Sequence, residues 1–156
     1  MGDLNMKSAK ICFTLFLTIV LTLFISGCDR FPTETYPFLQ KRANVEAVEI
    51  CRNDDRTGFR ETIVTLTGSE TDLLWYTMSQ TYCFNDKSLF MPSEYGNIVI
   101  KIRYKDGCLE IIGSNMTTWT SSSGITAVTN YRFYGGDFVG VIENFVSNDV
   151  IAEFYG

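Results

Sequence analysis

The sequence predicts an α+β domain, in which an antiparallel sheet of about five strands carries two helices on one face in the order β-β-α-β-β-β-α. Three observations lead to this prediction. Every second residue from 98 to 104 is apolar, with the charged Lys101 and Arg103 between them, and an Asp-Gly pair follows. Two other segments, near residues 75 and 141, space their apolar side chains as an α-helix does.

The domain is expected to begin at residue 45 with two short strands. Residues 45–51 and 60–66 are rich in β-branched and apolar side chains, and Asn53, Asp54 and Gly58 lie between them. Asn, Asp and Gly favour tight turns, because they form local hydrogen bonds or tolerate positive φ. We therefore expect two strands joined by a turn.

A helix is expected from residue 69 to about residue 81. Ser69 is a suitable N-cap, because its hydroxyl can accept from an unpaired amide of the first turn. Leu74, Met78 and Tyr82 recur at helical spacing. These three side chains are expected to form the stripe that faces the core.

The clearest strand covers residues 98–104, where Ile98, Ile100 and Ile102 share one face. Asp106 and Gly107 follow it, and glycine supplies the positive φ that a tight turn requires. Residues 108–113 are expected to return as the antiparallel partner. This hairpin should lie at the centre of the sheet.

The C-terminal part is expected to hold one more strand and one more helix. Residues 115–124 are rich in Ser and Thr and are interpreted as a loop, and residues 125–134 as a strand. Asp137 can cap a closing helix whose apolar side chains face the core. Residues 150–155 are interpreted as a short terminal strand or as a cover over the core.

The N-terminal residues have the pattern of a secretory signal. Residues 11–25 are uncharged and mostly apolar, Lys7 and Lys10 precede them, and the small residues Ser26 and Gly27 follow. The apolar run is shorter than the roughly 20 residues of a spanning helix. We therefore expect a cleaved signal peptide, although an uncleaved anchor helix remains an alternative.

The run Ile25-Ser26-Gly27-Cys28 resembles the lipobox of bacterial lipoproteins, with Ile in place of the usual Leu at the first position. The resemblance implies that a diacylglyceryl group, with acyl chains such as palmitate, is attached to the Cys28 thiol and that a peptidase then cuts before this residue. The expected organisation is a signal peptide over 1–27, a lipidated cysteine and extended tether over 28–44, and the α+β domain over 45–156. The alternative for the tether is that Phe31, Tyr36 and Phe38 dock on the domain and order part of it. The protein is then expected on the extracytoplasmic face of the cell membrane.

Composition argues against several functions. The chain has 13 basic and 18 acidic residues, so no nucleic-acid partner is expected. It contains no histidine, the commonest general base and metal ligand. Asp54 and Asp55 are better explained as turn residues than as an acid–base pair. We expect no enzymatic activity, no catalytic residues, no cofactor and no metal site.

The expected mature chain, which begins at Cys28, holds three further cysteines, namely Cys51, Cys83 and Cys108. They allow one disulfide at most, in any of three pairings, and such a bridge is chemically permitted outside the cytoplasm. The alternative is that all three are small core side chains. The sequence leaves this choice open.

The best candidate for a recognition surface is an aromatic, weakly charged region after residue 116. It comprises the side chains of Trp119, Tyr131, Phe133 and Tyr134. Such surfaces are enriched at recognition sites for proteins, and a glycan is the other partner considered. The alternative is that these aromatic residues pack in the core.

Residues 45–146 are also similar to a group of small, uncharacterised bacterial lipoproteins. The shared features are the pair Cys83-Phe84, a strand closing on Lys-Asp-Gly at 105–107, the LEIIG run at 109–113 and the aromatic pair Phe133-Tyr134. They imply a fold but no activity. We therefore expect an anchored binding or accessory domain. The alternatives are a carboxylate-based enzyme acting on cell-envelope polymers and an inhibitor of a single protein partner.

Overall fold

The computed structural model describes residues 33–54, 58–85, 95–133 and 137–155. Its elements, in chain order, are β1 (Thr33–Thr35), the 3₁₀ helix η1 (Arg42–Asn44), β2 (Val45–Asp54), β3 (Phe59–Leu66), α2 (Gly68–Gln80), β4 (Tyr82–Asn85), β5 (Ile98–Tyr104), β6 (Leu109–Ile112), β7 (Thr117–Thr120), β8 (Thr126–Thr129), β9 (Tyr131–Phe133), α3 (Asp137–Ile142) and α4 (Asn148–Tyr155).

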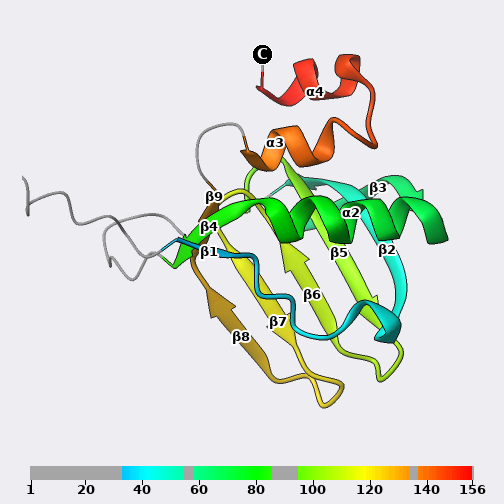
Figure 1. Cartoon of the computed structure of the whole chain (residues 1–156), viewed down its shortest axis with the longest axis vertical. Coiled ribbons are helices and arrows are strands. Elements are labelled where there is room, and N and C mark those ends of the chain that lie inside the picture. The colour runs from blue at the N-terminus through cyan, green and yellow to red at the C-terminus, as the bar shows by residue number, and fades with distance from the viewer. Residues whose placement is uncertain (1–32, 55–57, 86–94, 134–136, 156) are drawn as a thin grey trace, which may run out of the picture. The chain divides into compact units, whose positions relative to one another are not determined.

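The strands form two sheets (Figure 1). The larger sheet has six antiparallel strands in the order β3-β2-β5-β6-β7-β8, and the smaller has three in the order β1-β4-β9. The α+β prediction is confirmed. The detail differs, because the described residues hold a second sheet and three α-helices instead of one five-stranded sheet and two helices.

The central hairpin predicted at residues 98–113 is confirmed. Strands β5 and β6 pair antiparallel, with Ile100 opposite Ile112 and Ile102 opposite Glu110, in the middle of the larger sheet. At the turn, Gly107 has a φ of +84°, and the Asp106 carboxylate accepts a hydrogen bond of 3.0 Å from the Cys108 amide. The Asp-Gly pair therefore forms the tight turn that the sequence predicts, with Gly107 at positive φ and Asp106 as the hydrogen-bond acceptor.

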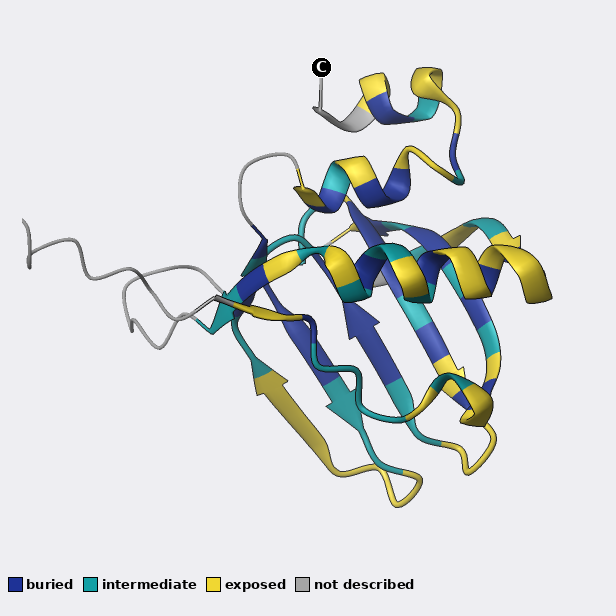
Figure 2. Cartoon of the chain, viewed as in Figure 1, coloured by how far each residue is buried: buried dark blue, intermediate teal, exposed yellow. Residues whose placement is uncertain are grey.

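The main core lies between the larger sheet and the helices (Figure 2). The central strands supply the fully buried Val48, Ile50, Ile98, Ile100, Ile102 and Ile112. Helix α2 contributes Leu74 and Met78, and α3 contributes Phe138, Val141 and Ile142. Burial of this apolar surface stabilises the fold at about 25 cal/mol per Å². A smaller cluster of Cys51, Val99 and Ile111 lies on the opposite face of the sheet.

The start of α2 differs from the prediction, whereas its end agrees with the expected end near residue 81. The N-cap is Thr67 instead of Ser69, and the Glu70 carboxylate accepts a 2.7 Å hydrogen bond from the Thr67 amide. This reciprocal arrangement is a capping box, which requires Glu three residues after the cap. The helix ends at Gln80, so Tyr82 lies in β4 with 57% of its surface exposed instead of completing the core stripe.

The C-terminal part holds more structure than expected. The Ser/Thr-rich region predicted as a loop contains β7, because threonine is β-branched and suits a pleated sheet. The strand predicted over residues 125–134 is two strands, β8 and β9, which belong to different sheets and meet at Asn130.

The terminal strand expected at 150–155 is wrong, because these residues belong to helix α4. The Ser147 carbonyl accepts hydrogen bonds from the amides of Val150 and Ile151, which winds the chain into a helical turn. Ile151 then packs against the main core.

The segment 33–44, expected to be part of an extended tether, is ordered on the domain instead. Strand β1 pairs with β4, and Tyr36 is buried with 4% of its surface exposed. The Phe38 ring stacks on the Trp75 ring of α2 with 3.6 Å between centroids. Aromatic burial is the reason, since each ring removes a large apolar area from water. Residues 28–32 of the expected tether lie outside the described residues.

We expect Gly113→Ala to destabilise the domain, because its new Cβ would lie 2.1 Å from the Tyr95 carbonyl oxygen. Relieving that clash requires backbone movement, which costs about 1–3 kcal/mol. The control is Gly140→Ala in α3, where a Cβ meets nothing within 4 Å. It should be neutral or stabilise by about 0.5–1 kcal/mol. Urea unfolding followed by circular dichroism measures both, and equal effects would contradict the expectation.

Candidate functional site

The most unusual side chain of the described residues is Glu110 on β6. It is the only charged residue among them in the buried class, with none of its surface exposed. Its position follows from the hairpin register, which places it opposite Ile102 on the face that holds the main core. Burying an ionised carboxylate costs several kcal/mol unless hydrogen bonds replace the lost water.

Four donors surround the Glu110 carboxylate. Oε1 accepts from the Tyr36 hydroxyl at 2.7 Å and from the Trp119 indole nitrogen at 3.0 Å. Oε2 accepts from the Leu39 amide at 3.2 Å and from the Tyr104 hydroxyl. Each oxygen thus receives one N–H, which can only donate, and one hydroxyl, which can also accept.

The surroundings of Glu110 change the pKa of its carboxyl group. Burial raises the pKa of Glu110 above its ordinary value, and the four hydrogen bonds oppose this shift without cancelling it. Burial, with the nearby Glu110 charge as the second cause, also raises the pKa of Tyr36 and that of Tyr104. Tyr36 has a second acceptor in the Thr117 hydroxyl at 3.2 Å, so its hydroxyl can turn when Glu110 gains a proton.

The Glu110 network fastens the N-terminal segment to the sheet. Two of its donors, Tyr36 and Leu39, belong to the segment after β1, whereas Tyr104 and Trp119 belong to β5 and β7. A side chain with no exposed surface offers no room for a substrate. We interpret the network as structural.

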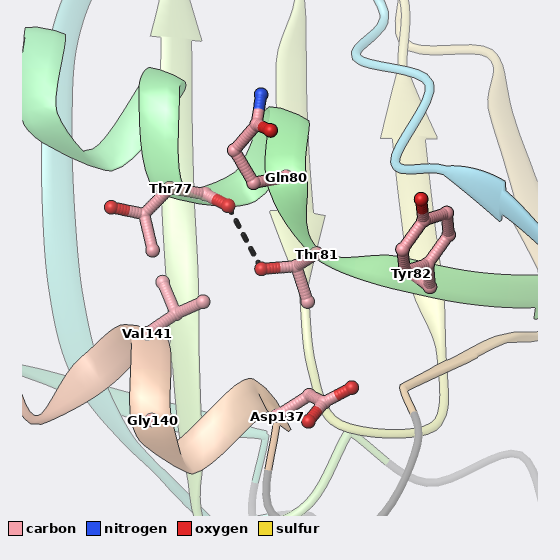
Figure 3. A pocket seen from close by; sticks show the side chains of 7 residues that line it. All are labelled: Thr77, Gln80, Thr81, Tyr82, Asp137, Gly140 and Val141. Atoms are coloured by element: carbon pink, nitrogen blue, oxygen red, sulfur yellow. Dashed lines mark hydrogen bonds between the residues drawn. The ribbon is translucent and has the colours of Figure 1, made fainter.

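A pocket lies between the end of α2 and the start of α3 (Figure 3). It has a volume of about 300 Å³ and is lined by Thr77, Gln80, Thr81, Tyr82, Asp137, Gly140 and Val141. In this view, Val141 points from α3 toward Thr77, and the Asp137 carboxylate lies across from Thr81. Its mixed polar and apolar lining and its position at the surface make it the candidate ligand site of the described domain.

Two of the four aromatic residues predicted as a recognition surface lie in the core. Tyr131 and Phe133 are buried, with 7% and 8% of their surfaces exposed, and their rings contact Tyr36. Trp119 is half-buried and donates to Glu110. Tyr134 lies outside the described residues. Side chains alternate between the two faces of a strand, and Tyr131 and Phe133 therefore point toward the core. Core packing was the alternative that the sequence left open for these residues.

The cysteines Cys51, Cys83 and Cys108 are free thiols. Burial raises the pKa of Cys83 to about 12 and also raises that of Cys51. Both are therefore protonated near neutral pH and poor nucleophiles. Within the described ranges, no group of three or more His, Cys, Asp or Glu side chains is placed to hold a metal ion.

Of the other predicted residues Asp54, Asp55 and Cys28, only Asp54 is among the described residues. Asp54 is exposed at the end of β2, and Asp55 lies outside the described residues, as does Cys28.

No helix within the described part of the chain is long and apolar enough to cross a bilayer. Comparisons of the chain with protein-family models, curated proteins and solved structures find no match.

Sequence reasoning missed both Glu110 and the pocket. The signal for Glu110 was present, because a turn at Asp106 and Gly107 sets the hairpin register and so turns Glu110 toward the same face as Ile102. The pocket had no such signal. Tyr82 was expected in the core and Asp137 was expected only as a helix cap.

We expect Glu110→Gln to lower the free energy of unfolding by about 1–3 kcal/mol. A glutamine amide nitrogen cannot accept, so either the Leu39 or the Trp119 N–H loses its partner in either orientation of the side chain. Urea unfolding at neutral pH measures the change. The control is Glu143→Gln, an exposed acid that should change stability by less than about 0.5 kcal/mol. A Glu110→Gln protein as stable as the wild type would contradict the expectation.

The effect of Glu110 should also depend on pH. Its pKa is higher in the folded chain, so folding takes up a proton between the unfolded and folded pKa values, and stability falls as pH rises through that interval. The stability difference between wild type and Glu110→Gln should thus be largest below the ordinary carboxyl pKa of about 4.3 and shrink above it. Unfolding curves across that interval test this, and a difference that grows with pH would refute it.

Proposed function

We propose that this protein is a bacterial lipoprotein, anchored through Cys28 at the extracytoplasmic face of the cell membrane, whose α+β domain binds a small ligand there. The observation that carries the proposal is the order of residues 7–28, in which two lysines, an apolar run and the lipobox-like Ile-Ser-Gly-Cys follow one another. Two acyl chains on one cysteine anchor durably, whereas a single chain binds only marginally.

The ordered N-terminal segment supports a domain held close to the membrane. The chain has five residues from Cys28 to Thr33, where β1 begins. Fully extended, they reach at most roughly 18 Å. Beyond β1, the Glu110 network fastens Tyr36 and Leu39 to the sheet.

The pocket supports ligand binding over carboxylate catalysis. A hydrolase of the rival type needs two carboxyl groups facing each other across a cleft. The pocket is lined by a single carboxylate, Asp137. Glu110, the other acid of interest, is buried in the core and bonded to four donors.

One observation favours the second candidate, an inhibitor of a single protein partner. Strand β8 is at the edge of the larger sheet; Val128 within it exposes 58% of its surface, and Ile125 just before it exposes 73%. Exposed edge strands can pair with an extended peptide. We prefer the ligand-binding proposal, because β8 has only four residues and short edge strands are a usual protection against pairing.

The anchor predicts the chemistry of the mature N-terminus. In a bacterial host, the wild-type protein should begin at Cys28 and carry a lipid mass on that residue. Cys28→Ser should abolish both the modification and the cleavage, which leaves residues 1–27 attached. Intact-mass spectrometry with N-terminal sequencing measures both outcomes.

The matched control for this experiment is Cys12→Ser, which changes the other cysteine of the N-terminal region without touching the lipobox-like run. Its mature product should be identical to that of the wild type. A full-length wild-type chain with an unmodified Cys28 would overturn the proposed anchor.

A further inference from the structure

The solvent side of α2 carries no charged side chain along its middle. The stripe opposite the buried side chains of the helix consists of four exposed residues, Ser69, Leu73, Tyr76 and Gln80. Leu73 and Tyr76 expose 45% and 66% of their surfaces. The acids Glu70 and Asp72 lie beside the stripe and are engaged there, Glu70 in the capping box and Asp72 in a 2.7 Å ion pair with Arg42. Surface helices usually turn charged side chains to water, so this stripe suits a less polar partner.

Tyr82 continues this apolar surface beyond the helix. It is the first residue of β4, it alternates with the buried Cys83, and it exposes 57% of its surface. Among the described residues, five large apolar side chains are exposed, and three of them are Leu73, Tyr76 and Tyr82, which we call the outer face. A tyrosine combines an apolar ring with a polar hydroxyl, and such side chains are enriched at the boundary between lipid and water.

The N-terminal segment joins the domain beside the outer face. Thr35 of β1 is the direct partner of Tyr82 in β4, and the two strands lie at the C-terminal end of α2 (Figure 1). The chain advances seven residues from Cys28 to Thr35, which reach at most roughly 25 Å when fully extended. A short tether raises the effective concentration of the surface to which it is attached. A contact too weak to hold a free domain is therefore populated in a tethered one.

We propose that the outer face rests on the lipid surface to which Cys28 is anchored, with Leu73, Tyr76 and Tyr82 at the level of the headgroups. The contact is apolar, because the stripe contains no Lys or Arg and the chain has more acidic than basic residues. It should therefore form on neutral headgroups and resist salt, which screens only charges. This inference rests on the proposed function, because it names the surface through which the anchored domain meets the membrane.

The test uses the full chain expressed in a bacterial host, labelled with ¹⁵N and placed in nanodiscs of phosphatidylcholine. A gadolinium chelate on a fraction of the lipid headgroups broadens the amide signals of nearby residues, and nanodiscs without gadolinium are the reference. The amides of the outer face should lose more signal than the amide of Val128. Val128 is a matched control on β8, because its exposed fraction of 58% equals that of Tyr82 within one per cent.

A double variant locates the contact. Leu73→Gln combined with Tyr76→Gln removes the apolar side chains and keeps good helix formers at both exposed positions, so the fold is retained, as circular dichroism can check. In this protein the Tyr82 amide should lose no more signal than the Val128 amide. The control is Val128→Thr, which keeps a β-branched residue on β8 and should leave the signal loss at the outer face unchanged.

Four results would overturn the inference. They are equal signal loss at the outer face and at Val128, a difference that survives in the double variant, a difference that disappears in high salt, and a dimer in detergent that the double variant does not form. The last result would assign the outer face to a second copy of the chain.

Failure of this inference is distinguishable from failure of the anchor, because intact-mass spectrometry of the same preparation reports on Cys28. A lipidated Cys28 without selective signal loss rejects the outer face as a lipid contact and retains the lipoprotein. An unmodified Cys28 with selective signal loss rejects the lipid anchor and retains the contact.

Discussion

A buried carboxylate must have all its lone pairs occupied, and this requirement determines how the parts of the domain meet. Glu110 draws its donors from three places in the chain: the segment after β1, the end of β5 and β7. None of these donors can shift far without leaving a buried polar atom unpaired, which costs about 1–3 kcal/mol. The network therefore fixes the N-terminal segment over the same face of the sheet on which α2 lies (Figure 1).

The same network holds the first described residues on the domain. The segment after β1 is held at Tyr36 and Leu39, and farther on the Gln40 side chain donates to Asp106 at 2.7 Å in the hairpin turn. These residues are therefore part of the folded domain and do not form a flexible linker.

The pocket has a different physical origin. It arises where two helices end and begin without filling the space between their termini. The negative end of α2 and the positive end of α3 both border it, and Asp137 lies in the first turn of α3, where an acid is favourable.

The sequence by itself determined the local elements whose residues act on near neighbours: the α+β class, the Asp106-Gly107 hairpin and the course of α2, since alternation, helical spacing and turn propensity are local properties. The tertiary structure decided the rest. Thr117 and Thr118 become strand residues because the β6 edge offers them partners, and Tyr131 and Phe133 become core residues because Tyr36 packs against them. The Glu110 network and the pocket join residues distant in the chain, so no local pattern specifies them.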